Sequence, residues 1–151
     1  MTATLDIRRQ SASVSGVWLN RPEVCNAFND GVIAEPTAAF SALGNDSGLR
    51  AIVLGGHGKT FCAGADLSWM RAMADYSWEQ NHADASGLAQ MWWTLWSCPV
   101  PIVGRIQGGC YAGGLGLAAV CDVAVASSAY VVRELGEQAS RCCFMSAERT
   151  P

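Results

Sequence analysis

The chain has 151 residues, a length typical of one domain. Half of the residues are hydrophobic and only 15% are charged, which excludes a disordered chain. The net charge of −3 provides no basic surface for a phosphodiester backbone, so nucleic acid is not an expected partner.

Two features bear on membranes and location. The N-terminus has no apolar stretch of signal-peptide length, which predicts a cytoplasmic protein. The apolar window between Arg105 and Arg133 contains five glycines and Asp122, a poor composition for a spanning helix. No membrane partner is therefore expected.

Seven cysteines form no C-x-x-C pair and have no histidine at metal-ligand spacing. This pattern predicts reduced, mostly buried thiols and no metal site. Cys62 lies in a glycine-containing loop and is an alternative nucleophile, although the sequence places neither His57 nor His82 as its base.

The first half of the chain begins with alternating strands at 5–7 and 13–19. A helix is predicted over 29–43, with cap candidates at its first two residues. Pro36 lies inside this helix, where it removes a backbone hydrogen bond and costs about 3 kcal/mol or more. The helix is therefore expected to kink or to start late.

The remaining predicted elements are a buried strand at 51–54, a short helix capped by Asp66, a helix at 78–96, strands at 102–106 and 123–126, and helices within 108–121 and 131–144. Hydrophobic periodicity switches between 2 and 3.6 along the chain, which is typical of α/β layering. The tryptophans of 78–96 are predicted to pack in the core, with a partner-facing or ligand-facing surface as the alternative.

Two segments repeat one design, in which a buried strand is followed by a glycine-containing loop and the start of a helix. The loops are 61–66 and 108–116. Such loops can offer backbone N–H groups to an anion or a carbonyl oxygen, and two together could form an oxyanion hole. Two alternatives are that the glycines only pack helix on sheet, or that 114–119 (G-x-G-x-x-A) belongs to a Rossmann-like nucleotide-binding half-domain. Glu134 has the spacing that the latter requires but lies in a helical pattern.

Three motifs in order resemble the enoyl-CoA hydratase/isomerase (crotonase) family. They are Leu19-Asn20-Arg21-Pro22-Glu23 with Asn26-Ala27-Phe28, then Phe61-Cys62-Ala63-Gly64-Ala65-Asp66-Leu67, then Gln107-Gly108 through Gly113-Gly114-Leu115-Gly116-Leu117 with Cys121-Asp122. Trp69-Met70 and Gly116-Leu117-Ala118 are similar to the methylglutaconyl-CoA and carboxygeranoyl-CoA hydratase branch. That branch implies a branched or carboxylated acyl chain and branched-chain or fatty acid catabolism.

The resemblance implies an α/β fold, a crotonase-like spiral of ββα units that is incomplete at the C-terminus, with residues 1–151 as a single N-terminal domain. It implies a lyase that adds water to a 2-enoyl-CoA thioester, with no cofactor because the CoA thioester is the substrate. The oxyanion donors would be the N–H groups of Ala63 and Gly113. The implied substrate-binding residues are Ala63, Gly64, Ala65, Asp66, Gly113, Gly114, Asn26 and Ala27.

The resemblance also predicts impaired chemistry. Gly116 stands where typical hydratases have a catalytic glutamate, and the comparison with the family pattern implies that the segment with a second glutamate, after Ser127, is deleted. The remaining acidic candidates are Asp66, Asp122, Glu134 and Glu137, of which Asp66 is better explained as a helix cap and Asp122 as a strand-start residue. Glu134 is the candidate that could replace the missing catalytic glutamate as the base. The alternative is a non-catalytic remnant of the fold that binds acyl-CoA or a partner.

Family similarity ends near Thr150-Pro151, so the helices that complete the acyl-CoA pocket and the subunit interface of relatives are expected to be absent. A trimer or hexamer, which the family implies, is therefore in doubt. Instability or self-association through the tryptophan-rich helix is expected instead.

Overall fold

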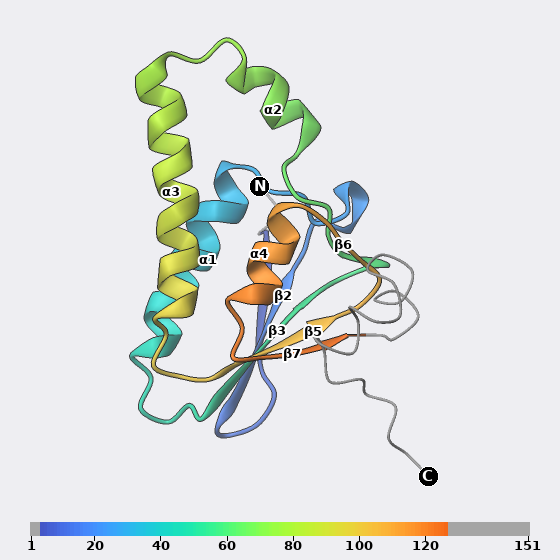
Figure 1. Cartoon of the computed structure of the whole chain (residues 1–151). Helices are drawn as coiled ribbons and strands as arrows, with labels where there is room; N and C mark the ends of the chain where they lie inside the picture. The colour runs from blue at the N-terminus through green and yellow to red at the C-terminus, as the bar shows by residue number, and fades with distance from the viewer. Residues whose placement is uncertain (1–3, 127–151) are drawn as a thin grey trace, which may run out of the picture.

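The computed structural model describes residues 4–126 (Figure 1). The elements in chain order are β1 (Leu5–Arg9), β2 (Val14–Leu19), the 3-10 turn η1 (Pro22–Val24), α1 (Asp30–Gly44), β3 (Ala51–Gly56), β4 (Thr60–Cys62), α2 (Leu67–Met73), α3 (Trp78–Trp96), β5 (Ile102–Ile106), β6 (Gly109–Cys110), α4 (Gly113–Ala119) and β7 (Val123–Ala126). The mixed α/β class is confirmed. The predicted helix at 131–144 lies outside the described residues.

A five-stranded sheet has the order β1-β2-β3-β5-β7. Strands β1 and β2 are antiparallel, and every later pair in this sheet is parallel. Asp122, at the start of β7, accepts a hydrogen bond from the Ile102 N–H at 2.8 Å, which confirms its predicted role. The described strands follow one another across the sheet without a reversal, so this sheet lacks the switch point at which a Rossmann fold binds its nucleotide.

A second, two-stranded sheet pairs β4 with β6 in parallel. These strands have three residues and two residues. Sequence periodicity missed both, because such short strands cannot display an alternating pattern. Their pairing brings together the two loops singled out in the sequence.

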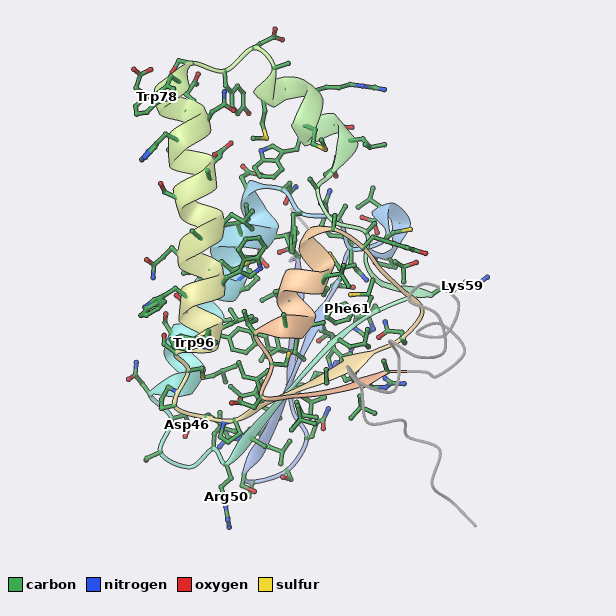
Figure 2. All side chains as sticks on the ribbon, in the orientation of Figure 1. Asp46, Arg50, Lys59, Phe61, Trp78 and Trp96 are labelled. Atoms are coloured by element: carbon green, nitrogen blue, oxygen red, sulfur yellow. The ribbon has the colours of Figure 1, made fainter. Side chains whose placement is uncertain are left out.

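Helices α1 and α3 pack side by side, and α4 lies between them and the strands in the view of Figure 1. The core between helices and sheet contains Phe28, Phe40, Phe61, Met91 and Leu95, each at most 2% exposed. Figure 2 shows Phe61 inside the molecule, and Lys59, two residues earlier, extending outward. None of the helices within residues 4–126 is long and apolar enough to cross a bilayer.

The tryptophan-rich helix α3 has the predicted bounds, 78–96, and starts with a capping box between Ser77 and Gln80. Its predicted core packing is wrong for three tryptophans. Trp78, Trp93 and Trp96 are 73%, 59% and 64% exposed, and Figure 2 shows the first and last at opposite ends of the helix. A helix buries one stripe, which Met91 and Leu95 occupy here, so the other side stays in solvent.

Helix α1 begins at Asp30, and the Asn29 side chain accepts a hydrogen bond from the Val32 N–H at 3.0 Å. Of the two outcomes expected from Pro36, a kink or a late start, the late start does not occur. Pro36 is buried within the helix, and the next residue, Thr37, donates its hydroxyl to the Ile33 carbonyl at 2.7 Å. Burial of the proline ring helps to offset the lost backbone bond.

Candidate functional site

The loop after β4 and the loop after β6 lie directly against each other; residues 62–66 and 110–113 are called the paired loops below. The Tyr111 N–H donates to the Cys62 carbonyl at 2.9 Å. Gly64 has a φ of +92°, and a Cβ placed there would lie 2.9 Å from the Ala112 Cβ and 3.5 Å from the Gly113 nitrogen. Glycine is required at position 64 both by its backbone angle and by the close approach of the other loop.

A buried asparagine ties the preceding segment to these loops. The Asn26 Nδ2 donates to the carbonyls of His57 and Thr60, at 2.9 Å each, and its Oδ1 accepts from the Arg21 N–H at 2.9 Å. Asn26 and its neighbour Ala27 are both buried. Both ends of the Asn26 amide are thus bonded within the protein, which favours a supporting role for this residue over a direct ligand contact.

Asp66 joins the first motif to the start of α2. Its carboxylate lies 3.0 Å from the Arg21 guanidinium and also accepts from the N–H groups of Ser68 and Trp69, at 2.9 and 3.4 Å. Burial raises the pKa of Asp66, but the hydrogen bonds from Ser68, Arg21 and Trp69 outweigh it and hold the pKa below its ordinary value. The predicted helix cap is confirmed, and an ionised, fully engaged carboxylate is a poor general acid or base.

The backbone amides separate into bonded and free groups. The Ala63 N–H donates to the Cys25 carbonyl at 3.0 Å, which does not agree with its expected role as an oxyanion donor. Phe28 bridges to the loop by donating to Gly64 O at 2.7 Å and accepting from the Asp66 N–H at 2.8 Å. In this parallel bridge the N–H of Ala65 faces away from Phe28.

Within residues 4–126, the N–H groups of Ala65, Ala112 and Gly113 in the paired loops have no protein acceptor. Ala65 is exposed and Gly113 half-buried, so both can meet a ligand. Gly114 differs, because its N–H donates to Tyr111 O at 2.8 Å and a Cβ there would lie 2.6 Å from the Cys62 carbonyl oxygen. Gly114 therefore allows the loops to pack, whereas Ala65 and Gly113 present free N–H groups from opposite loops.

Cys62 does not have the environment of a nucleophile. Its side chain is buried, its thiol donates to the Asn26 carbonyl at 3.2 Å, and burial raises its pKa to about 11. The imidazole of His57 lies 2.9 Å from the Asp6 carboxylate instead. At neutral pH the Cys62 sulfur is thus a protonated core group.

An aromatic ring packs against α4 at Gly116. Gly116 lies one helical turn after Gly113, and a Cβ built on it would be 2.9 Å from two ring carbons of Trp92 on α3. The Trp92 Nε1 is buried and has no hydrogen-bond partner among the described residues. At the position where typical hydratases have a glutamate, this chain thus has no side chain and the ring of another helix fills the space.

One acidic residue was missed by the sequence analysis. Asp84 Oδ2 is buried without a hydrogen-bond partner in the described part of the chain. Its spacing of four and seven residues from Leu88 and Met91 on the apolar stripe of α3 was the available signal. Glu134 and Glu137 lie outside the described residues.

Comparisons with known proteins identify the family of this chain. A family model described as enoyl-CoA hydratase/isomerase matches residues 9–137. A Mycobacterium tuberculosis protein named as a probable enoyl-CoA hydratase is 40% identical over 116 residues, which are 77% of this chain and 44% of that protein. The mouse mitochondrial Delta(3,5)-Delta(2,4)-dienoyl-CoA isomerase is 31% identical over 131 residues, covering 80% of this chain and 39% of the isomerase.

Solved structures give the same result. The crystal structure of an enoyl-CoA hydratase from Shewanella pealeana matches with a TM-score of 0.79 and 31% identity, covering 93% of this chain and 60% of that one. An enoyl-CoA hydratase from Mycobacterium smegmatis matches with a TM-score of 0.77 and 31% identity, covering 93% and 62%. The chain spans about half the length of the curated relatives it matches. With the crotonase-like fold and the matching motifs in place, the chain belongs to the enoyl-CoA hydratase/isomerase family.

Proposed function

We propose that the paired loops bind the thioester carbonyl of an acyl-CoA and that the chain supports hydration of a 2-enoyl-CoA. The observation that carries this proposal is the pair of free N–H groups, Ala65 and Gly113, on two loops in contact. Two such donors polarise a carbonyl and stabilise the enolate-like charge that develops as water adds to the 2,3 double bond. The relatives named above, a probable enoyl-CoA hydratase and a dienoyl-CoA isomerase, support this substrate class.

The oxyanion donors in this proposal are Ala65 and Gly113, in place of the expected Ala63 and Gly113. The buried side chains of Phe61 and Asn26 support the loops on the side of the core. The ion pair between Arg21 and Asp66 holds the start of α2 in position. Gly64 allows the two amides to approach each other. No separate cofactor enters the proposal, because CoA is part of the substrate.

We further propose that hydration by this chain is slow. Water addition needs a base for the attacking water and an acid for the α-carbon, and backbone amides can do neither. Asp66 and Asp122 are engaged in hydrogen bonds, and Gly116 supplies no carboxylate. The second candidate function, acyl-CoA binding without turnover, is favoured by the same observation.

A pair of ligands tests carbonyl recognition without altering the protein. Butanoyl-CoA has the thioester oxygen, whereas the thioether S-butyl-CoA lacks it and is otherwise closely matched. Because two hydrogen bonds of about 1 kcal/mol each act on that oxygen, we expect the thioester to bind about tenfold or more tightly by calorimetry. Equal affinities would contradict the oxyanion hole, and absence of binding by either ligand would contradict the acyl-CoA site.

Turnover separates the two candidate functions. The chain is mixed with 2-butenoyl-CoA, and loss of the absorbance of the conjugated thioester is followed over time. Measurable hydration supports the enzyme, and tight binding of butanoyl-CoA with no hydration supports the binding protein.

A further inference from the structure

The ring of Trp92 occupies the space directly above Gly116. A Cβ on Gly116 would lie 2.9 Å from the Trp92 Cε2 and Cζ2 atoms and 3.1 Å from Nε1. These atoms are at the far end of the side chain, so the ring reaches from α3 across to α4. The fit requires glycine at position 116, since any larger residue would displace the ring.

This contact lies beside the proposed carbonyl site. Gly113 and Gly116 are three residues apart on α4, which places them on one side of the helix and about 4.5 Å apart along its axis. The bond from Cα to the side chain in a helix tilts toward the helix N-terminus, so the ring over Gly116 lies on the side of that residue that faces the Gly113 N–H. An acyl chain held by its carbonyl oxygen at that N–H would bring its first carbons toward this ring.

Beside Gly116, the Trp92 ring would affect a ligand through its shape and not through a hydrogen bond. Its Nε1–H makes no hydrogen bond among the described residues, and the ring is packed against the core of the domain. Neighbouring Met91 and Leu95 are buried on the same helix, which restricts movement of Trp92 toward the protein interior. A flat, apolar, supported ring is a barrier to a substituent that points toward α4.

We propose that Trp92 is a specificity-determining residue that admits unbranched acyl-CoA thioesters and excludes those with a branch at C3. This inference rests on the proposed function and names the acyl class of that same site. It differs from the branched or carboxylated chain that the resemblance to methylglutaconyl-CoA hydratases implies.

The test compares butanoyl-CoA with 3-methylbutanoyl-CoA, neither of which has a double bond to hydrate. One methyl group in a closely packed site changes binding by about tenfold or more, so the intact chain is expected to prefer butanoyl-CoA by about that factor. In Trp92→Leu the preference is expected to fall to within about twofold, because the smaller side chain leaves room above Gly116. Calorimetric dissociation constants give both ratios.

Trp93→Leu is the matched control, because it removes the same side chain from the next position, which is exposed. Its ligand preference is expected to equal that of the intact chain. If Trp92→Leu does not fold, Trp92→Phe replaces it and is expected to lower the preference in the same direction. An unchanged ratio in the folded Trp92 variant, or an equal change in Trp93→Leu, overturns the inference. If the intact chain binds neither thioester, the proposed function fails and this inference fails with it, whereas binding without discrimination overturns the inference alone.

Discussion

Asp66 links three parts of the candidate site. It is the last residue of the loop that includes Ala65, and its carboxylate binds Arg21 and caps α2. The side chains of Arg21 and Asp66 are only 18% and 13% exposed. Such a pair is screened less by solvent than a surface pair, so its loss should be measurable in the free energy of unfolding.

We predict that Asp66→Asn lowers the free energy of unfolding by about 1–3 kcal/mol at pH 7, because asparagine keeps the helix cap but loses the charged hydrogen bonds. The pKa of Asp66 is depressed in the folded chain. Its contribution is therefore fully present above the ordinary aspartate pKa of about 4 and is lost as the pH falls through the lower folded value. Urea unfolding at a series of pH values should show the wild-type advantage shrinking below about pH 4.

The control for this prediction is Asp46→Asn. Asp46 pairs with Arg9 at 2.6 Å, but its side chain is 37% exposed and that of Arg9 46%. An exposed pair contributes about 1 kcal/mol or less. If Asp46→Asn lowers the free energy of unfolding as much as Asp66→Asn does, the effect comes from removing any carboxylate and not from the partly buried pair at the site.

Residue roles were predictable from sequence where they depend on neighbours in the chain. The cap at Asp66 follows from a local pattern and is confirmed. Asp122 was predicted to bond a backbone donor at the start of its strand, which is confirmed, but its partner, Ile102, lies twenty positions earlier and was not identified from sequence. The identity of the free amide was not predictable, because Ala63 is engaged by Cys25 and Ala65 is left free by Phe28, residues about forty positions earlier. Motif matching identifies the loop, and the hydrogen bonds across it decide which N–H faces a ligand.

At the scale of the elements, length decides what the sequence predicts. The 19-residue helix α3 and the strands β5 and β7 have the bounds that periodicity indicates. Strands β4 and β6 do not, although their pairing assembles the site. They form because the rest of the fold brings residues 60 and 109 together, and no window of the sequence contains that information.

Pro36 lies inside α1 and affects the stability of that helix. Pro36→Ala restores an N–H that can donate to the Val32 carbonyl and removes the ring from the helix interior. Because Pro36 is buried, the lost apolar volume offsets part of this gain, and we expect the free energy of unfolding to rise by about 1–2 kcal/mol. Equilibrium urea unfolding measures the change. A decrease in the free energy of unfolding would mean that packing of the proline ring stabilises the fold more than the missing backbone hydrogen bond destabilises it.

At the scale of the whole molecule, the described fold brings together the two proposed oxyanion donors, whereas the carboxylates of Asp66 and Asp122 are engaged in hydrogen bonds. Leu67, Met70, Tyr111 and Leu115 are exposed apolar residues that flank the paired loops and suit an apolar acyl or pantetheine chain. The single-domain assignment of 1–151, the trimer or hexamer, self-association and the cytoplasmic location remain predictions.

The position of Gly116 under Trp92 predicts that a carboxylate cannot be restored by one substitution. In Gly116→Glu the new Cβ would meet the Trp92 ring at 2.9 Å, so the glutamate is expected to displace the ring or to point away, with little gain in activity. In the double variant Gly116→Glu with Trp92→Leu, the glutamate has room beside the free N–H of Gly113. A positioned acid–base group contributes roughly 10²–10⁴ in rate, and hydration of 2-butenoyl-CoA should rise toward that factor over the intact chain. The double variant Gly116→Gln with Trp92→Leu is the matched control, because it has the same shape without the carboxylate and should show no gain. Equal rates in the glutamate and glutamine variants would show that space and not proton transfer limits the reaction, because the two differ only in the carboxylate.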